Sequence, residues 1–92
     1  MEDAKIILTV IGADKIGIIA KFASTLADFN VNVEDVRQTL MQDYFTMVMM
    51  ADYSKSTKRF SEIKDAVMNL ANEMEMEAWV QRKKIFDKMH LI

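Results

Sequence analysis

Apolar and polar residues recur along this chain with periods that predict four strands and three helices. Period-two alternation is typical of a strand with one buried face, and apolar residues three and four apart are typical of an amphipathic helix. Strands are predicted over residues 4–11, 31–41, 45–53 and 76–83, and helices over residues 14–29 and 58–74. Helical spacing continues in the C-terminal tail, residues 84–92, so a short packed helix is expected there.

The order strand, helix, strand, strand, helix, strand predicts an α+β fold of the ferredoxin-like βαββαβ type. Two right-handed crossovers place the strands in one antiparallel sheet of order 4-1-3-2, with both long helices on the same face. The even positions of the first strand, from Ala4 to Val10, are all apolar and are assigned to the helix-covered face. The opposite face then carries an apolar patch, which is typical of an interface. It is formed by Ile7, Thr9, Val48, Met50 and Trp79.

The second strand has an irregular pattern and an exposed position in this topology. Val31 and Val33 alternate in one phase and Val36 and Leu40 in the other, so either a bulge lies near residues 34–35 or the strand begins there. In the order 4-1-3-2 this strand is an edge, and open edges favour pairing with another strand. We therefore expect a homodimer with two sheets side by side across the second strand and with the first helices in contact.

The connection from the first strand to the first helix is the most informative stretch. Gly12 is predicted to end the strand, and Asp14 is a favourable N-cap for the helix. Asn30 is expected to end that helix in the left-handed conformation. A helix N-terminus next to a strand end can bind a small anion or a carboxylate, although the two glycines also fit a tight connection with no ligand.

Composition limits the classes of function. A length of 92 residues, 51% hydrophobic residues, two glycines and no proline indicate one globular domain over residues 1–92, with residues 84–92 as its tail. A net charge of −2 offers no general attraction for nucleic acid or membranes. The absence of cysteine and the single His90 argue against a metal site. No leader or long apolar run is found, so a cytoplasmic protein is expected.

No arrangement of residues predicts an enzyme, so no catalytic residue, metal or cofactor is expected. An acylphosphatase would need an arginine in the loop after the first strand, where this chain has Lys15. Glu34 and Asp35 point to opposite faces of a strand and are interpreted as a solvated pair. The basic run at residues 82–84 is interpreted as a solvated strand end.

Two motifs resemble a known family. The stretch Gly-x-Asp-Lys-x-Gly-Ile over residues 12–18, followed after one helix by Asn-Val-Asn-Val-Glu-Asp-Val over residues 30–36, resembles the ACT domain. This domain is a small regulatory ligand-binding module of amino-acid metabolism. The chain is most similar to small stand-alone ACT proteins related to the glycine-cleavage repressor, and the resemblance covers nearly its whole length.

The resemblance implies a binding site for a small effector, commonly an amino acid. Asp14 would bind the ligand amino group or else cap the helix, while the N–H groups of Ile16 and Gly17 would bind the carboxylate. Asn32 matches an effector contact from a neighbouring strand. The implied ligand residues are Gly12, Ala13, Asp14, Lys15, Ile16, Gly17, Ile18 and Asn32.

These implied contacts require two subunits. Asp14 and Asn32 flank the first helix, whose length separates them by about 20 Å at 1.5 Å per residue. One amino acid cannot bridge that gap, so Asn32 would come from a second copy. The resulting hypothesis is a ligand-binding regulatory domain that acts through an unidentified protein partner. The alternative is a structural dimeric interaction module that binds no ligand.

Overall fold

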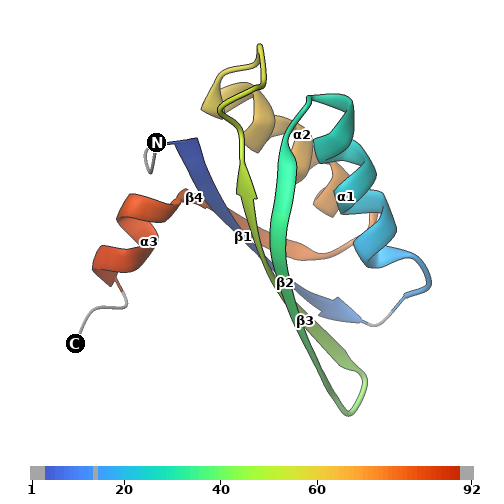
Figure 1. Ribbon diagram of the computed structural model, residues 1–92. Helices are drawn as coiled ribbons and strands as arrows, with labels where there is room; N and C mark the ends of the chain where they lie inside the picture. Colours follow the sequence, from blue (N-terminus) through green and yellow to red (C-terminus); the bar gives the residue numbers. More distant parts are fainter. Residues whose placement is uncertain (1–3, 14, 90–92) are drawn as a thin grey trace.

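The computed structural model describes residues 4–13 and 15–89 of the 92-residue chain. The elements in chain order are β1 (Lys5–Ala13), α1 (Ile18–Asp28), β2 (Asn32–Met41), β3 (Tyr44–Asp52), α2 (Phe60–Glu73), β4 (Glu77–Arg82) and α3 (Lys83–Met89). The strands form one antiparallel sheet in the order β2-β3-β1-β4, which is the predicted order read from the other edge. Figure 1 shows α1 and α2 together on one face, with α3 apart from them. The ferredoxin-like prediction, with its C-terminal helix, is confirmed.

The apolar core lies between the sheet and the two long helices. In β1, Ile6, Leu8 and Val10 are completely buried, as their even spacing predicted. β3 adds Phe45, Met47, Met49 and Ala51, and the helices add Phe22, Leu26, Ile63 and Val67. None of the described polar or charged side chains is buried. Burial of apolar surface therefore supplies the main stabilisation of the described fold.

The other sheet face is largely open and apolar at its centre. Thr9 pairs with Val48 on one side and with Trp79 on the other, so these three side chains share that face. Trp79 is 49% exposed, as expected for an uncovered position. Ile7 lies on the same face but is only 6% exposed, and α3 contacts both β1 and β4. The predicted patch is confirmed, except that Ile7 is buried.

The edge strand β2 carries a bulge, which is the first of the two alternatives that the sequence left open. The β2–β3 register shifts between Val33 and Asp35, which leaves Glu34 without a partner residue in the ladder. The Glu34 carboxylate instead accepts a hydrogen bond from Lys5 Nζ at 2.5 Å. The bulge restores the apolar phase, because Val33 and Val36 then both face the helices.

Both long helices end in the same backbone motif. At the end of α1, the Asn30 N–H donates to the Ala27 carbonyl and the Val31 N–H donates to the Leu26 carbonyl. This is a Schellman motif, and Asn30 has the left-handed φ of +61° that was predicted for it. Glu75 takes the equivalent position after α2, with a φ of +58°.

Three predicted boundaries are wrong. Gly12 does not end β1, because it pairs with Phe45 and the strand continues to Ala13. The longer strand moves the turn, so α1 begins at Ile18 rather than at residue 14. The start of α2 also moves, from residue 58 to Phe60.

Candidate functional site

The loop between β1 and α1 leads into a helix N-terminus that no side chain of the described residues caps. Gly17 occupies the N-cap position with a left-handed φ of +79°, and glycine has no side chain that could cap the helix. The predicted N-cap, Asp14, therefore does not hold that position, and Asp14 itself lies outside the described residues. The Lys21 N–H donates to the Gly17 carbonyl at 3.0 Å, which closes the first helical turn.

The free donors of this helix differ from the predicted ones. The N–H groups of Ile18, Ile19 and Ala20 precede that of Lys21 and have no partner within the helix. The prediction had named those of Ile16 and Gly17. No acidic side chain lies in the first turn of α1. The positive end of the helix is thus not neutralised by its own first turn. A carboxylate would find suitable donors there.

The rest of the loop is anchored on the junction between α2 and β4. The Lys15 ammonium donates a hydrogen bond to the Met74 carbonyl and lies 3.9 Å from a carboxylate oxygen of Glu75. A cation at a helix C-terminus is favourable because the carbonyls there carry partial negative charge. Lys15 therefore holds the loop in place, and its ammonium is already engaged.

Gly12 packs closely against the same junction. A Cβ atom at Gly12 would lie 3.0 Å from Cγ of Met76 and 3.1 Å from its Cε. The missing side chain lets Met76, which is buried, pack directly on the β1 backbone. Gly12 and Ala13 thus lie within the end of β1, and the Ile18 side chain is buried in the core, so that only its backbone could contact a ligand. Ile16, by contrast, is 99% exposed beside the helix N-terminus.

Asn32 lies at the opposite end of the sheet. It is the first residue of β2 and pairs with Asp52, which in turn pairs with Lys5 at the start of β1. Gly12 pairs with Phe45, so seven residues of β3 separate the two levels. At 3.4 Å per residue the separation is roughly 24 Å. Within one chain, Asn32 and the loop cannot contact the same amino acid.

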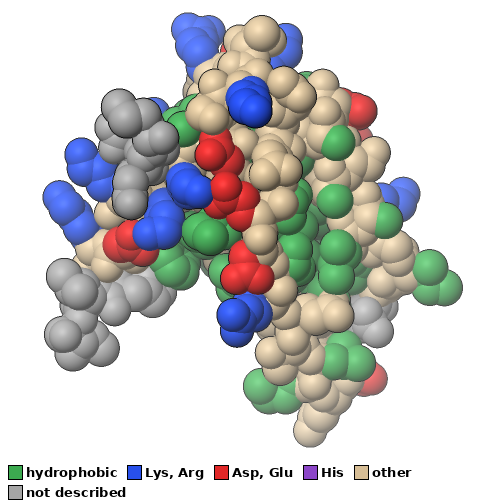
Figure 2. Space-filling model, in the orientation of Figure 1, with side chains coloured by type: hydrophobic (Ala, Val, Ile, Leu, Met, Phe, Trp, Pro, Cys, Tyr) green, Lys and Arg blue, Asp and Glu red, His purple; other side chains and the backbone are tan. Residues whose placement is uncertain are grey.

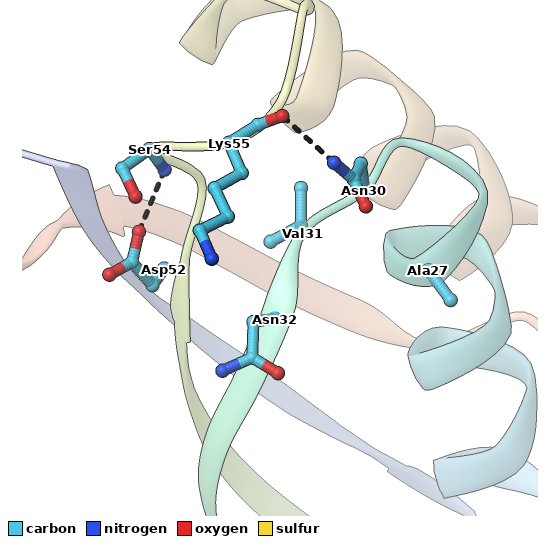
Figure 3. A pocket seen from close by; sticks show the side chains of 7 residues that line it. All are labelled: Ala27, Asn30, Val31, Asn32, Asp52, Ser54 and Lys55. Carbon is cyan, nitrogen blue, oxygen red and sulfur yellow. Dashed lines mark hydrogen bonds between the residues drawn. The ribbon is translucent and has the colours of Figure 1, made fainter.

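A polar hollow surrounds Asn32. It has a volume of about 440 Å³, and Figure 3 shows the side chains that line it. They are Ala27, Asn30, Val31, Asn32, Asp52, Ser54 and Lys55. Its wall is fixed by two hydrogen bonds, from Asn30 Nδ2 to the Lys55 carbonyl at 2.9 Å and from the Ser54 N–H to Asp52 Oδ1 at 2.7 Å.

The hollow holds charges of both signs. The pKa of Asp52 is lowered, first by the hydrogen bond from the Ser54 backbone, then by the Ser54 side chain, and less by the charge of Lys5. Asp52 is therefore ionised at neutral pH. The Lys55 side chain extends over the same hollow (Figure 3). A carboxylate, an ammonium and an amide in one hollow suit a small zwitterion.

Asp52, Ser54 and Lys55 were not predicted as site residues. The sequence signal was the Asp-x-Ser spacing at the end of the third strand, which favours a local side-chain turn. The proximity of these three residues to Asn32 follows only from the pairing of β2 with β3. Among the described residues, no group of three potential metal ligands comes together, and no helix is long and apolar enough to cross a membrane.

Comparisons with known proteins agree with this architecture. A family model described as ACT domain matches residues 4–81. A UPF0237 protein of Listeria innocua is 45% identical over 84 residues, which are 91% of this chain and 94% of that protein. An ACT domain protein from Streptococcus pneumoniae superposes with a TM-score of 0.77 and 29% identity, over 90% of this chain and 93% of that one. The ligand-free regulatory subunit of aspartate kinase from Thermus thermophilus has a TM-score of 0.67 at 21% identity, over 87% of this chain and 52% of that one, and shows the fold alone.

Proposed function

We propose that this chain, which belongs to the ACT domain family, binds a small amino-acid-type ligand and regulates a partner protein. ACT domains as a class are regulatory ligand-binding modules. The observation that carries the proposal is the N-terminus of α1, which no described side chain caps and which has no acidic residue in its first turn. A ligand carboxylate can accept from the N–H groups of Ile18, Ile19 and Ala20.

Asp14 is proposed to bind the ligand ammonium. It precedes this N-terminus by only a few residues, and the N-cap position that it would otherwise fill is taken by Gly17. A charge-assisted contact to a ligand ammonium is the role that we assign to the acidic residue of this loop. Lys15 and Gly12 position the loop and are not assigned to the ligand.

The second part of the proposed site comes from another copy of the chain. Asn32 lies roughly 24 Å from the loop along β3, and β2 is an exposed edge strand. Antiparallel pairing of two β2 strands would bring the Asn32 end of one copy toward the loop end of the other. The hollow around Asn32 supports this arrangement, since Asp52 and Lys55 add charges complementary to a zwitterion.

The charges on β2 favour one of two neighbouring registers for that pairing. Asp35 and Arg37 lie on the open face, and Arg37 Nε is 3.7 Å from Asp35 Oδ2 within the chain. With Val36 on the two-fold axis, each Asp35 opposes Arg37 of the partner subunit. Shifting the axis to Arg37 would oppose two like charges, which is destabilising. The dimer with Val36 on the axis is therefore favoured.

The dimer is tested by light scattering at micromolar concentration. The wild-type protein should have twice the monomer mass of 10.6 kDa. Asp35→Arg should weaken association, because it places two like charges opposite each other. The double variant Asp35→Arg/Arg37→Asp should recover the dimer. A monomeric wild-type protein would contradict the two-subunit site, and a double variant as weak as the single one would contradict the register.

Ligand binding is tested by a thermal-shift screen of the twenty amino acids. A ligand present at 100 times its dissociation constant adds about 2.7 kcal/mol to the free energy of unfolding. In a domain of this size that raises the melting temperature by at least about 10 °C. The screen supports the proposal if one amino acid or a related group stands out. A dimer that no amino acid stabilises would favour the alternative.

That alternative is a dimeric interaction module that binds no ligand, and one observation favours it. The open sheet face carries Trp79, 49% exposed, beside the partly buried Val48 and Met50. Exposed tryptophan next to apolar neighbours is typical of a protein interface. In the regulatory proposal the same face would contact the regulated partner, so the two functions differ only in the ligand.

A further inference from the structure

A second hollow lies between the end of β3 and α3, and it shares no residue with the hollow around Asn32. It has a volume of about 530 Å³ and is lined by Tyr53, Arg82, Lys84, Ile85 and Lys88. Three of these five side chains are cationic and none is acidic. Figure 2 shows Lys and Arg side chains gathered over α3. In a chain with a net charge of −2, this is a local concentration of positive charge.

Arg82 is held in position by an aromatic ring. Its guanidinium carbon lies 4.4 Å from the centroid of the Phe60 ring, and that ring lies 6.3 Å from the ring of Tyr53. Attraction between the cation and the ring face restrains the guanidinium and leaves its N–H groups available. Within the described part of the chain, the Arg82 guanidinium makes no hydrogen bond and no ion pair.

Lys84 and Lys88 are the other two cationic residues that line the hollow. They are four residues apart on α3 and so lie on one side of that helix, where like charges repel each other. The acidic residue of α3, Asp87, is already paired with Lys83 Nζ at 2.6 Å. Neither Lys84 nor Lys88 has an acidic partner among the residues that the structure describes. An anion between them and Arg82 would relieve the repulsion.

We propose that this hollow binds a phosphate monoester of about mononucleotide size. A monoester carries a charge of about −1.5 to −2 at neutral pH and three acceptor oxygens, which matches a fixed guanidinium and two ammonium groups better than a single carboxylate does. Tyr53 and Ile85 supply apolar surface for the organic part of the ligand. This site would give the protein a second effector, distinct from the amino-acid-type ligand.

The proposal is tested by calorimetric titration with AMP, adenosine and inorganic phosphate at low salt. AMP should bind saturably and more weakly as salt increases, because screening reduces the attraction. Adenosine, which lacks the phosphate, and inorganic phosphate, which lacks the organic part, should each bind at least tenfold more weakly. No saturable binding of AMP at about 5 mM would overturn the proposal. Equal binding of inorganic phosphate and AMP would overturn the assignment of an organic ligand.

A charge-matched pair of variants localises the binding. Lys84→Glu/Lys88→Glu should reduce AMP affinity at least tenfold, while Lys21→Glu/Lys64→Glu changes two exposed lysines outside the hollow by the same net charge. Circular dichroism checks that both variants are folded, and Lys84→Gln/Lys88→Gln replaces the first variant if it is not. Equal losses of AMP affinity in the two double variants would show a general charge effect and refute the site. Because the hollow contains none of the proposed amino-acid contacts, failure here leaves the amino-acid screen unaffected.

Discussion

The substitution Gly17→Ala tests whether the start of α1 depends on a left-handed residue. Gly17 has a φ of +79°, and a Cβ atom added there would meet no atom within 4 Å. Steric overlap therefore contributes nothing, and the cost is that of the backbone conformation alone. For a residue with a Cβ that cost is about 1–2 kcal/mol. It corresponds to a decrease in melting temperature of roughly 4–16 °C at 4–8 °C per kcal/mol in a domain of this size.

The assay is thermal unfolding followed by circular dichroism, with urea unfolding to give the free energy. Gly17→Asn is the matched control, because asparagine adopts the left-handed conformation more readily, and it should recover part of the loss. Gly12→Ala provides a contrast, since its Cβ would contact Met76 while its backbone is an ordinary strand. If Gly17→Ala unfolds at the wild-type temperature, Gly17 does not hold this conformation and the open N-terminus is wrongly described.

Three further predictions concern the binding residues, the open face and pH. Asp14→Asn should weaken binding of the amino acid found in the screen about ten- to a hundredfold, since a charge-assisted contact is worth about 1.5–3 kcal/mol; unchanged calorimetric affinity would remove Asp14 from the site. Trp79→Ala should weaken docking of a partner on the open face, measured by pull-down, while light scattering shows an unchanged dimer; a stability loss above about 3 kcal/mol with normal docking would instead assign Trp79 to the monomer core. The pKa of Asp52 is lower in the folded state than in the unfolded state. The ionised Asp52 therefore stabilises the fold above its unfolded-state pKa, and this stabilisation is lost as the pH falls through its folded-state pKa. In urea unfolding, Asp52→Asn should accordingly lose less stability below about pH 4 than the wild type does. Parallel pH profiles of stability for the two proteins would contradict the Ser54 hydrogen bonds as the cause of the lowered pKa.

The sheet and its two faces could be predicted because they depend on local alternation. Leu8 and Trp79 follow a period of two, and each lies on the face that this period assigned to it. The left-handed conformation of Asn30 was also predictable, since few residues other than glycine adopt it easily. Each of these features is decided by residues close together in the chain.

The details of the candidate site depend on contacts between distant segments, and these were not predictable. Gly12 stays in β1 because it pairs with β3 and packs against Met76. Lys15 is engaged by the Met74 carbonyl, 59 residues further along the chain. The hollow around Asn32 likewise combines the end of α1 with the end of β3. A sequence pattern gives no register between such segments, so it could indicate the loop but not the surroundings of each residue.

The two-subunit ligand site is tested most directly by mixing two variants that each lack one half. Asp14→Ala and Asn32→Ala are prepared separately, then mixed under conditions that exchange subunits, and binding of the amino acid from the screen is measured before and after mixing. In a two-fold dimer, each mixed pair has one intact site and one site with both defects. Random exchange makes about half of the dimers mixed, so about a quarter of all sites should regain wild-type affinity. If mass spectrometry confirms the exchange and no site is regained, Asp14 and Asn32 do not bind one ligand across the dimer.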